Sequence, residues 1–448
     1  MTKSMTSGNP AKLIFLFSLP LIIGNIFQQF YSMADTLIVG RTVGVNALAA
    51  VGCTGSLSFL ILGFANGFTS GLSIITAQRF GAGDSEGVKR SFAASLVLSA
   101  ATALLMTVLA VFLARPALEL LQTPAEIIDD AETYILIIFY GISASVLFNF
   151  ASNMMRALGD SRVPLYFLVF ACFLNILLDL ALILVFHLGV AGVGIATVFS
   201  QLVSGICCFV YILKKLPAFR VERKHFQLDR REILRHFNIA LPMAFQSSII
   251  AIGALTLQSA LNSLGALSVA AYTASQKIDT IATLPVSSFG SAMATYAAQN
   301  YGAGKIDRIR KGVFQCICMS VSFSLVMGAV NAVFGSSLAS IFVSSAETEV
   351  LSLSKTYLTV NGSLYWVLAL LFIYRFTLQG LGNGLVPTIA GIMELIMRAF
   401  AALILVRLAG FTGACFANPL AWIGACIPLA IAYYASMRRM ARASWTTA

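Results

Sequence analysis

The chain has 448 residues, of which 58% are hydrophobic and only 10% are charged, and its mean hydropathy is +0.88. Soluble domains carry roughly a quarter charged residues, so this composition excludes a water-soluble globular protein and indicates an integral membrane protein. The net charge of +11 does not indicate nucleic-acid binding, because the basic residues concentrate in alternate segments between long apolar runs.

Long continuous apolar runs follow one another along the chain. Each is long enough to cross a hydrocarbon core of about 30 Å as a helix of roughly 20 residues. The runs lack the period-two alternation of the short strands in an outer-membrane barrel. The sequence therefore predicts an all-α membrane protein of about twelve transmembrane helices. They are expected near residues 13–38, 46–77, 91–114, 131–155, 163–186, 190–213, 237–263, 267–297, 312–335, 351–379, 385–408 and 412–436.

Lysine and arginine are distributed unevenly between the two sets of alternating connections. One set, which includes both terminal segments, holds 22 of the 29 basic residues. The opposite set holds Arg41, Arg115, Lys355 and Arg407. The positive-inside rule places the richer set in the cytoplasm. We therefore expect both termini to be cytoplasmic.

The two halves of the sequence repeat one another at an offset of about 222 residues. Ser18-Leu19-Pro20 recurs as Ala240-Leu241-Pro242, and Leu158-Gly159-Asp160 recurs as Leu381-Gly382-Asn383. Each half holds six predicted helices, an even number, so both halves enter the membrane in the same orientation. Several transporters are built from such parallel repeats.

The duplication predicts a division of the chain into three parts. The first is an N-terminal lobe of residues 1–213, and the last is a C-terminal lobe of residues 237–448. Residues 214–236, which carry eight basic and three acidic side chains, are expected to form an amphipathic cytoplasmic linker.

Sequence features of an enzyme are missing. A phosphate-binding loop would need the pattern Gly-x-x-x-x-Gly-Lys-Ser/Thr, which does not occur. If the function is transport, it must therefore draw on an ion gradient. The cysteines lie in apolar runs without a Cys-x-x-Cys spacing, which argues against disulfides and a zinc site. His187, His225 and His236 fall in loops or at helix ends, where we expect surface residues. We therefore expect no enzyme and no cofactor.

Four acidic residues lie inside predicted helices, beyond the first turn: Asp35, Asp179, Asp279 and Glu394. Inserting a charged side chain at this depth costs roughly 2.5–3.5 kcal/mol and usually marks a functional site. The alternative for Asp35 and Asp179 is a structural hydrogen bond to a neighbouring helix. The insertion cost favours the functional role.

Asp35 and Asp179 have other oxygen-bearing side chains nearby. Asn175 precedes Asp179 by four residues and shares its helix face, and Thr197 on the next helix adds a hydroxyl. Two carboxylates, an amide oxygen and a hydroxyl suit a hard cation such as Na⁺ or a shared proton. Without an imidazole or thiolate, the set does not suit a transition metal. We expect this set to couple transport to H⁺ or Na⁺.

Other polar side chains in the first half are candidates for a substrate cavity. Gln28 and Tyr31 share the helix face of Asp35, and Asn149 and Asn153 lie one turn apart on the helix of residues 131–155. Pro20 removes a backbone hydrogen bond within the first helix, so we expect a bend there that moves this face.

The second half carries a different pair of charges. Glu394 and Arg398 are spaced four residues apart, which favours an ion pair of structural or gating function over a substrate site. Lys277 and Asp279 are two residues apart and do not face each other. Their roles, and that of Arg375, are left open by the sequence.

The chain resembles the multidrug and toxic compound extrusion (MATE) family, in particular its DinF-like and MepA-like prokaryotic branch. The resemblance covers essentially the whole length. It rests on the motifs Ser18-Leu19-Pro20, Asp35 to Gly40, Ala47 to Gly52, Gln78 to Gly83 and Arg156 to Asp160.

This resemblance implies a V-shaped pair of six-helix lobes that export organic cations and drugs by alternating access, in exchange for H⁺ or Na⁺. It implies a monomer in the prokaryotic cytoplasmic membrane, surrounded by membrane lipids. In the DinF-like branch the cation site matches Asp35, Asn175, Asp179 and Thr197. The alternative within the wider superfamily is a lipid-linked oligosaccharide flippase. A flippase should carry basic residues in its cavity to hold pyrophosphate, whereas the first half offers mainly acids and amides.

Overall fold

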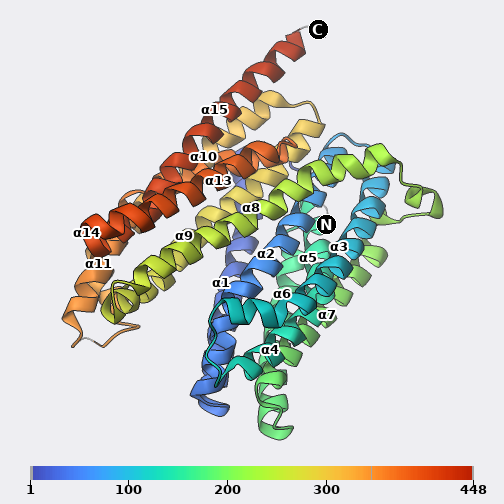
Figure 1. Cartoon of the computed structure of the whole chain (residues 1–448). Helices are drawn as coiled ribbons and strands as arrows, with labels where there is room; N and C mark the ends of the chain where they lie inside the picture. The colour runs from blue at the N-terminus through green and yellow to red at the C-terminus, as the bar shows by residue number, and fades with distance from the viewer. Residues whose placement is uncertain (1–3, 345, 446–448) are drawn as a thin grey trace. The chain divides into compact units, whose positions relative to one another are not determined.

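The computed structural model describes residues 4–344 and 346–445, and this part of the chain contains helices and no β-strand (Figure 1). The α-helices are α1 (Pro10–Thr42), α2 (Val45–Gly81), α3 (Ser85–Leu120), α4 (Ile128–Tyr140), α5 (Ile142–Ala157), α6 (Arg162–Leu180), α7 (Gly189–Lys215), α8 (Arg230–Asn262), α9 (Ala266–Gly302), α10 (Ile306–Ala339), α11 (Thr348–Ser363), α12 (Tyr365–Gly380), α13 (Leu385–Phe400), α14 (Val406–Cys415) and α15 (Ala417–Trp445). Two π-helical segments, η1 (Ala181–Val185) and η4 (Ala401–Leu405), follow α6 and α13.

The helices agree with the predicted membrane spans. Among the described residues, nine helical segments are long and apolar enough to cross a membrane. The pairs α4–α5 and α11–α12 each count as one further span, bent by 44° and 48°. Helix α9 corresponds to the predicted span 267–297 and has 37 residues, but polar side chains such as Lys277 and Asp279 lower its hydropathy. The prediction of an all-α, multi-span membrane protein is confirmed.

The duplication is visible in the backbone. Both bent pairs and both π-helical segments occupy equivalent places in the two halves. Gly159 and Gly382 both adopt a left-handed conformation, with φ of 84° and 85°, which glycine takes without steric cost. Asp160 follows the first glycine and Asn383 follows the second. The side-chain oxygen of each accepts a hydrogen bond from a backbone N–H at the start of the following helix. The repeated motif therefore ends one helix and starts the next in each half.

The chain forms two compact units that are not contiguous in sequence. Unit 1 is built from Ile23–Ser248, and unit 2 combines Met5–Ile22 with the chain from Ile249 onward. Helices α1 and α8 are therefore each shared between the units. This differs from the predicted lobes of residues 1–213 and 237–448, since the start of each half packs with the opposite unit. In α1 the division falls two residues after Pro20.

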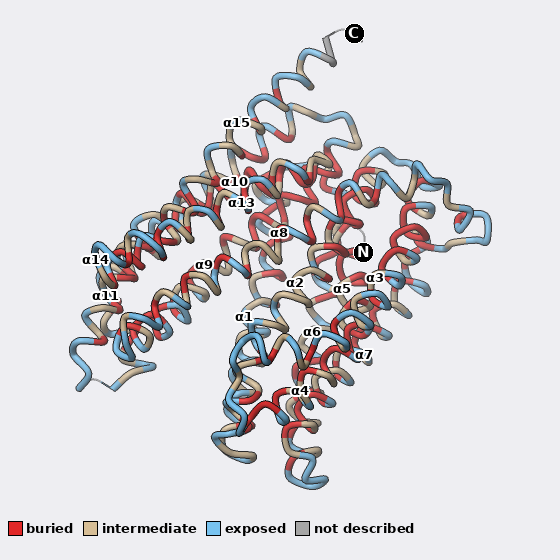
Figure 2. Tube along the Cα trace, in the orientation of Figure 1, coloured by how far each residue is buried: buried red, intermediate tan, exposed pale blue. Residues whose placement is uncertain are grey.

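Buried positions follow the inner faces of the helices (Figure 2), and apolar side chains at such positions form a core in each unit. In unit 1, Phe68 of α2 and Phe150 of α5 lie in one such cluster. The connection from α7 to α8 belongs to it as well, because the fully buried ring of Phe219 stacks on Phe92 with centroids 4.5 Å apart. The region predicted as a linker is thus held against α3 by two short 3-10 helices, η2 (Pro217–Phe219) and η3 (Arg223–Phe226).

Candidate functional site

The residues predicted to couple transport lie together inside unit 1, on three helices. Asp35 is on α1, Asn175 and Asp179 are on α6, and Thr197 is on α7. Asn175 and Asp179 are fully buried, which their spacing of one helical turn on the inner face of α6 explains. Asp179 lies in the last turn of α6, directly before the π-helical segment η1, and such segments often occur at functional sites.

The hydroxyl of Thr197 connects the three helices. Its Oγ1 accepts hydrogen bonds from the Tyr31 hydroxyl of α1 at 3.3 Å and from Asn175 Nδ2 of α6 at 3.5 Å. The same hydroxyl donates to the carbonyl of Val193 within α7 at 3.0 Å. Thr197 therefore holds the Tyr31 and Asn175 side chains in place beside the two carboxyl groups.

Several buried oxygens of this cluster make no hydrogen bond to any described residue. They are Asp35 Oδ1, Asn175 Oδ1 and both carboxylate oxygens of Asp179. Tyr31 and Asn175, which precede Asp35 and Asp179 by one helical turn, both meet at Thr197, so the two carboxyl groups lie near each other. A buried acceptor without a partner is costly, and two carboxylates side by side repel each other when both are charged. A proton shared between them, or a small hard cation, would satisfy both conditions.

Tyr134 is a neighbour of the site that the sequence did not indicate. It lies on α4 and packs against the apolar cluster that contains Val39 of α1 and Ile183 of η1, beside the helix segments that carry the two carboxyl groups. The sequence places Tyr134 near the start of a predicted span. The direction of its side chain depends on the rotation of α4 about its axis. A single aromatic residue in an apolar run does not define that rotation.

The residues predicted for the substrate cavity are not all brought together. Tyr31 joins the Thr197 cluster, whereas Gln28 is exposed. Asn149 Nδ2 donates to the Ser145 carbonyl of its own helix, and Asn153 Nδ2 donates to Thr69 Oγ1 of α2 at 3.3 Å. The hydrogen bonds between described residues do not link these two asparagines to the carboxyl groups. It stays a prediction that these asparagines face a substrate cavity. The bend of α1 at Pro20 also stays a prediction.

In unit 2, the predicted pair of Glu394 and Arg398 is part of a larger buried cluster. Glu394 Oε2 lies 3.6 Å from Arg398 Nη2, but Glu394 Oε1 makes a closer contact with Arg375 of α12. The prediction missed this partner because Arg375 is 19 residues away in sequence. Arg398 also donates to Asn418 Oδ1 of α15 at 3.3 Å. The cluster therefore ties α12, α13 and α15 together, and the structural or gating function of the pair stays a prediction.

Asp279, whose role the sequence left open, also belongs to a hydrogen-bonded group in unit 2. It accepts a hydrogen bond from the Tyr365 hydroxyl at the start of α12. The same hydroxyl accepts from Asn331 Nδ2 of α10 at 2.9 Å. Lys277 instead points to the ring of Phe342, with its Nζ 5.8 Å from the ring centroid. The two neighbouring charges thus face different surroundings, as their spacing predicts.

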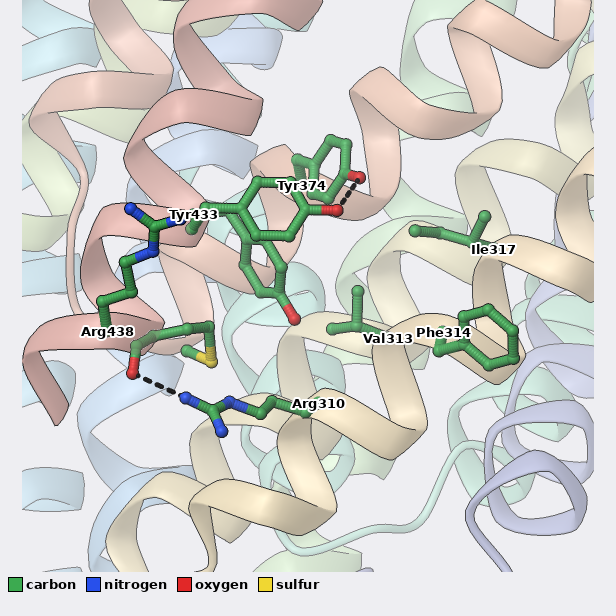
Figure 3. Close-up of a pocket in the computed structure, with 9 residues that line it drawn as sticks. Arg310, Val313, Phe314, Ile317, Tyr374, Tyr433 and Arg438 are labelled. Carbon is green, nitrogen blue, oxygen red and sulfur yellow. Dashed lines mark hydrogen bonds between the residues drawn. The ribbon is translucent and has the colours of Figure 1, made fainter. Parts of the chain in front are cut away.

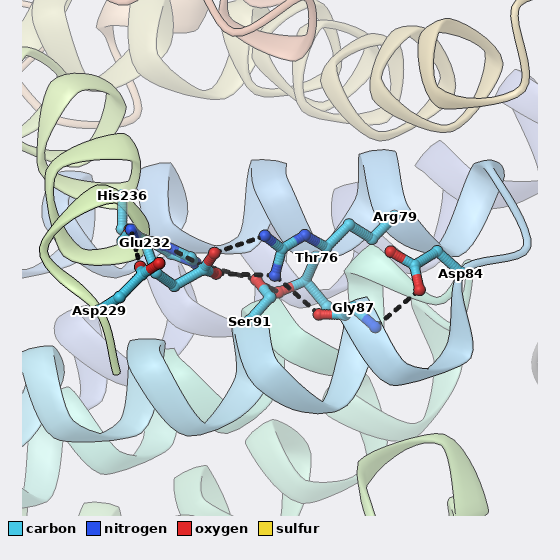
Figure 4. A network of polar contacts seen from close by, with 8 residues as sticks. All are labelled: Thr76, Arg79, Asp84, Gly87, Ser91, Asp229, Glu232 and His236. Atoms are coloured by element: carbon cyan, nitrogen blue, oxygen red, sulfur yellow. Dashed lines mark hydrogen bonds and ion pairs between the residues drawn. The ribbon is translucent and has the colours of Figure 1, made fainter. Parts of the chain in front are cut away.

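A polar network joins the start of α8 to α2 and α3 in unit 1 (Figure 4). Both Nη atoms of Arg79 donate to the Glu232 carboxylate, at 2.7 and 2.6 Å, and Nη1 also donates to the Gly87 carbonyl. His236 lies beside this pair, and its Nε2 is 2.9 Å from Ser91 Oγ. Because α8 continues into unit 2, the network fixes the end of α8 that belongs to unit 1.

The expectation of surface histidines is wrong for two of the three. His236 and His225 are almost fully buried. His225 Nε2 lies 3.0 Å from Glu86 Oε2, and His225 Nδ1 accepts from the backbone N–H of Glu222 at 2.8 Å. Both imidazoles are buried because the α7–α8 connection packs against α3. The sequence of this basic segment does not indicate that contact.

Comparisons with known proteins agree with this architecture. A family model described as MatE matches residues 20–181 and 242–404, one match in each half of the duplication. The probable multidrug resistance protein YpnP of Bacillus subtilis is 31% identical over 354 residues, which cover 79% of this chain and 78% of that protein. A protein of Shewanella oneidensis named FAD transporter is 25% identical over 407 residues, covering 88% of this chain and 87% of its own. A crystal structure of MATE in complex with MaL6 has the same fold, with a TM-score of 0.91 at 22% identity over 99% of this chain and 100% of its own.

Proposed function

The chain belongs to the MatE family of membrane transporters, and we propose that it exports cationic or amphiphilic drugs in exchange for H⁺ or Na⁺. In this proposal Asp35, Asn175, Asp179 and Thr197 bind the coupling ion. Multidrug resistance proteins among its relatives support drug export. The protein would work as a monomer in the cytoplasmic membrane of a prokaryote, with both termini in the cytoplasm and without a bound cofactor.

The observation that carries the proposal is the pair of adjacent carboxyl groups in the interior of unit 1. Asp35 and Asp179 lie near each other, and their buried oxygens lack hydrogen bonds from other described residues. Binding a proton or Na⁺ there removes uncompensated negative charge from a region of low dielectric. The positively charged substrate would favour the deprotonated, ion-free carboxylates. The ion and the substrate would therefore exclude each other, which is what exchange requires.

Exchange also requires alternating access, in which the binding site opens to one side of the membrane and then to the other. An ion drives transport only if it binds one conformation more strongly than the other. In the proposed cycle, ion binding changes the contacts that Asp35 of α1 makes with Asp179 of α6. Because α1 is shared between the two units, a change in α1 at Asp35 can affect both of them.

Flux measurements in proteoliposomes test the proposal. The full-length protein is reconstituted, proton and sodium gradients are imposed separately, and movement of a fluorescent cationic dye is followed. We expect one gradient to drive dye movement against its concentration gradient. Asp35→Asn and Asp179→Asn should each abolish this movement, because an amide keeps the side-chain shape but neither takes up a proton nor offsets a cation. Asp130→Asn, at an exposed aspartate of α4, is the matched control and should transport normally.

Two results would overturn the proposal. The coupling site lies elsewhere if Asp35→Asn and Asp179→Asn both transport like the unmodified protein. The substrate class is wrong if neither gradient moves the dye while FAD or a fluorescent lipid-linked sugar crosses the membrane. Size-exclusion profiles of each variant in detergent separate loss of transport from loss of folding.

A further inference from the structure

A pocket of about 350 Å³ lies between three helices of unit 2, apart from the residues discussed above (Figure 3). Helix α12 packs against both α10 and α15, whereas α10 and α15 barely touch each other. The three helices thus form a groove with α12 between its two sides. The side chains that line the pocket are Arg310, Val313, Phe314 and Ile317 of α10, Tyr374 of α12, and Tyr433, Tyr434, Met437 and Arg438 of α15.

Three tyrosines form one wall of the pocket. The rings of Tyr374 and Tyr433 are buried and lie with centroids 5.2 Å apart, and the Tyr434 ring packs at the same distance from Tyr433. The hydroxyls of Tyr374 and Tyr434 are 3.5 Å apart. An aromatic wall with hydroxyl groups offers both apolar contact and hydrogen-bond donors to a bound molecule.

The edge of the pocket is cationic. Arg310 Nη2 donates to the Met437 carbonyl at 3.0 Å, which holds the guanidinium beside the pocket. Among the described residues, its one acidic ion-pair partner is the fully exposed Asp307, 3.8 Å away. Arg438 is exposed and makes no ion pair or hydrogen bond with the described part of the chain. Two guanidinium groups with little compensating charge favour an anionic ligand and disfavour a cationic drug.

Apolar side chains continue from the pocket along the outer faces of two helices. On α10, Phe314 and Leu325 are 68% and 57% exposed, and on α15, Ile431 and Ile427 are 66% and 57% exposed. Their spacings of 11 and four residues place each pair on one face of its helix. In a membrane protein such stripes contact lipid acyl chains. The cationic edge therefore meets two lipid-facing stripes at the groove.

We propose that this pocket binds an anionic phospholipid from the leaflet at the basic ends of α10 and α15. Arg310 and Arg438 contact the phosphate, and the tyrosine hydroxyls contact the rest of the headgroup. The acyl chains lie along the stripes of Phe314 and Ile431. Basic pockets between transmembrane helices at the cytoplasmic side are known to select anionic headgroups, and the positive-inside prediction places these ends there.

Lipid titration of the full-length protein in detergent tests this site. Thermal stabilisation and native mass spectrometry are recorded with phosphatidylglycerol, phosphatidylcholine, glycerol 3-phosphate and inorganic phosphate. We expect phosphatidylglycerol to bind more tightly than phosphatidylcholine, and the two soluble phosphates not to bind in the same range. Arg310→Gln and Arg438→Gln should each weaken phosphatidylglycerol binding about fivefold, and the double variant about 25-fold, without changing phosphatidylcholine binding.

Arg439→Gln is the matched control. It removes a neighbouring exposed arginine of α15 that does not line the pocket, so the preference for the anionic lipid should change less than twofold. Arg438→Gln is the cleaner of the two single variants, because Arg310 also contacts a backbone carbonyl. The proposal is wrong if both lipids bind equally, or if the double variant keeps the preference for phosphatidylglycerol. Binding of inorganic phosphate as tight as that of the lipid would reassign the pocket to free anions.

Discussion

Replacing Glu394 by glutamine should destabilise unit 2 strongly. The side chains of Glu394 and Arg375 are each 4% exposed, and that of Arg398 is 10% exposed. Glu394 is the only carboxylate that the described residues place against these two guanidinium groups. Its neutralisation leaves two buried positive charges that no other carboxylate of the described residues compensates.

The size of the effect follows from this burial. Breaking a buried ion pair by removing one partner costs about 3–5 kcal/mol. Each kcal/mol shifts the unfolding temperature of a domain of 150–250 residues by roughly 2–4 °C. Glu394→Gln should therefore lower the unfolding temperature in detergent by about 6–20 °C.

Replacing either arginine in the Glu394→Gln variant should restore part of its thermal stability, and the two replacements should differ in how much they restore. Arg398 keeps hydrogen bonds to Asn418 and to the Ile250 carbonyl, whereas Arg375 Nε has no hydrogen-bond partner among the described residues. Arg375→Gln should therefore restore more of the stability lost in Glu394→Gln than Arg398→Gln does. A double-mutant cycle in thermal unfolding measures each coupling energy. The reasoning fails if Glu394→Gln unfolds within about 2 °C of the unmodified protein, or if Arg398→Gln rescues better.

Three further substitutions test other parts of the structure. Arg79→Gln removes the paired hydrogen bonds to Glu232 and should reduce the free energy of unfolding by about 2 kcal/mol. Amide hydrogen exchange should become faster at the start of α8, while distant helices stay protected. Gly67→Ala places a Cβ 2.6 Å from the Met243 carbonyl of α8, so we expect a loss of about 1–3 kcal/mol in thermal unfolding, and an unchanged unfolding temperature would contradict this packing. Thr197→Val removes the hydroxyl that joins three helices and should raise the ion concentration for half-maximal transport about fivefold, whereas Thr197→Ser should stay near normal.

The membrane spans and the duplication were predictable because both are local or periodic properties of the sequence. A run of about 20 apolar residues has few stable alternatives to a helix in lipid. The repeated motif around Gly159 and Gly382 predicted two equivalent turns, and both glycines adopt the same positive φ. The grouping of Asp35 with Asn175, Asp179 and Thr197 was also predicted, since acids in apolar helices are rare and the family resemblance connects them.

Other features depend on contacts between segments far apart in the chain. Arg375 is the closest partner of Glu394, and the buried His236 lies against Ser91 of α3. Tyr134 of α4 packs against the cluster of Val39 and Ile183, near the carboxyl groups, only because α4 is rotated toward them. Helix periodicity states which residues share a face but does not state which other helix covers that face.

The composition and the order of apolar runs by themselves determined a helical membrane protein with two similar halves. Only the tertiary structure decided that α1 and α8 are each shared between the two compact units. The reason is physical: an apolar helix in lipid is stable wherever it packs, so its sequence defines its length but leaves its neighbours open. Two kinds of contact select those neighbours once the chain is folded. One is close packing at small residues such as Gly67, and the other is a polar pair such as Arg79 with Glu232.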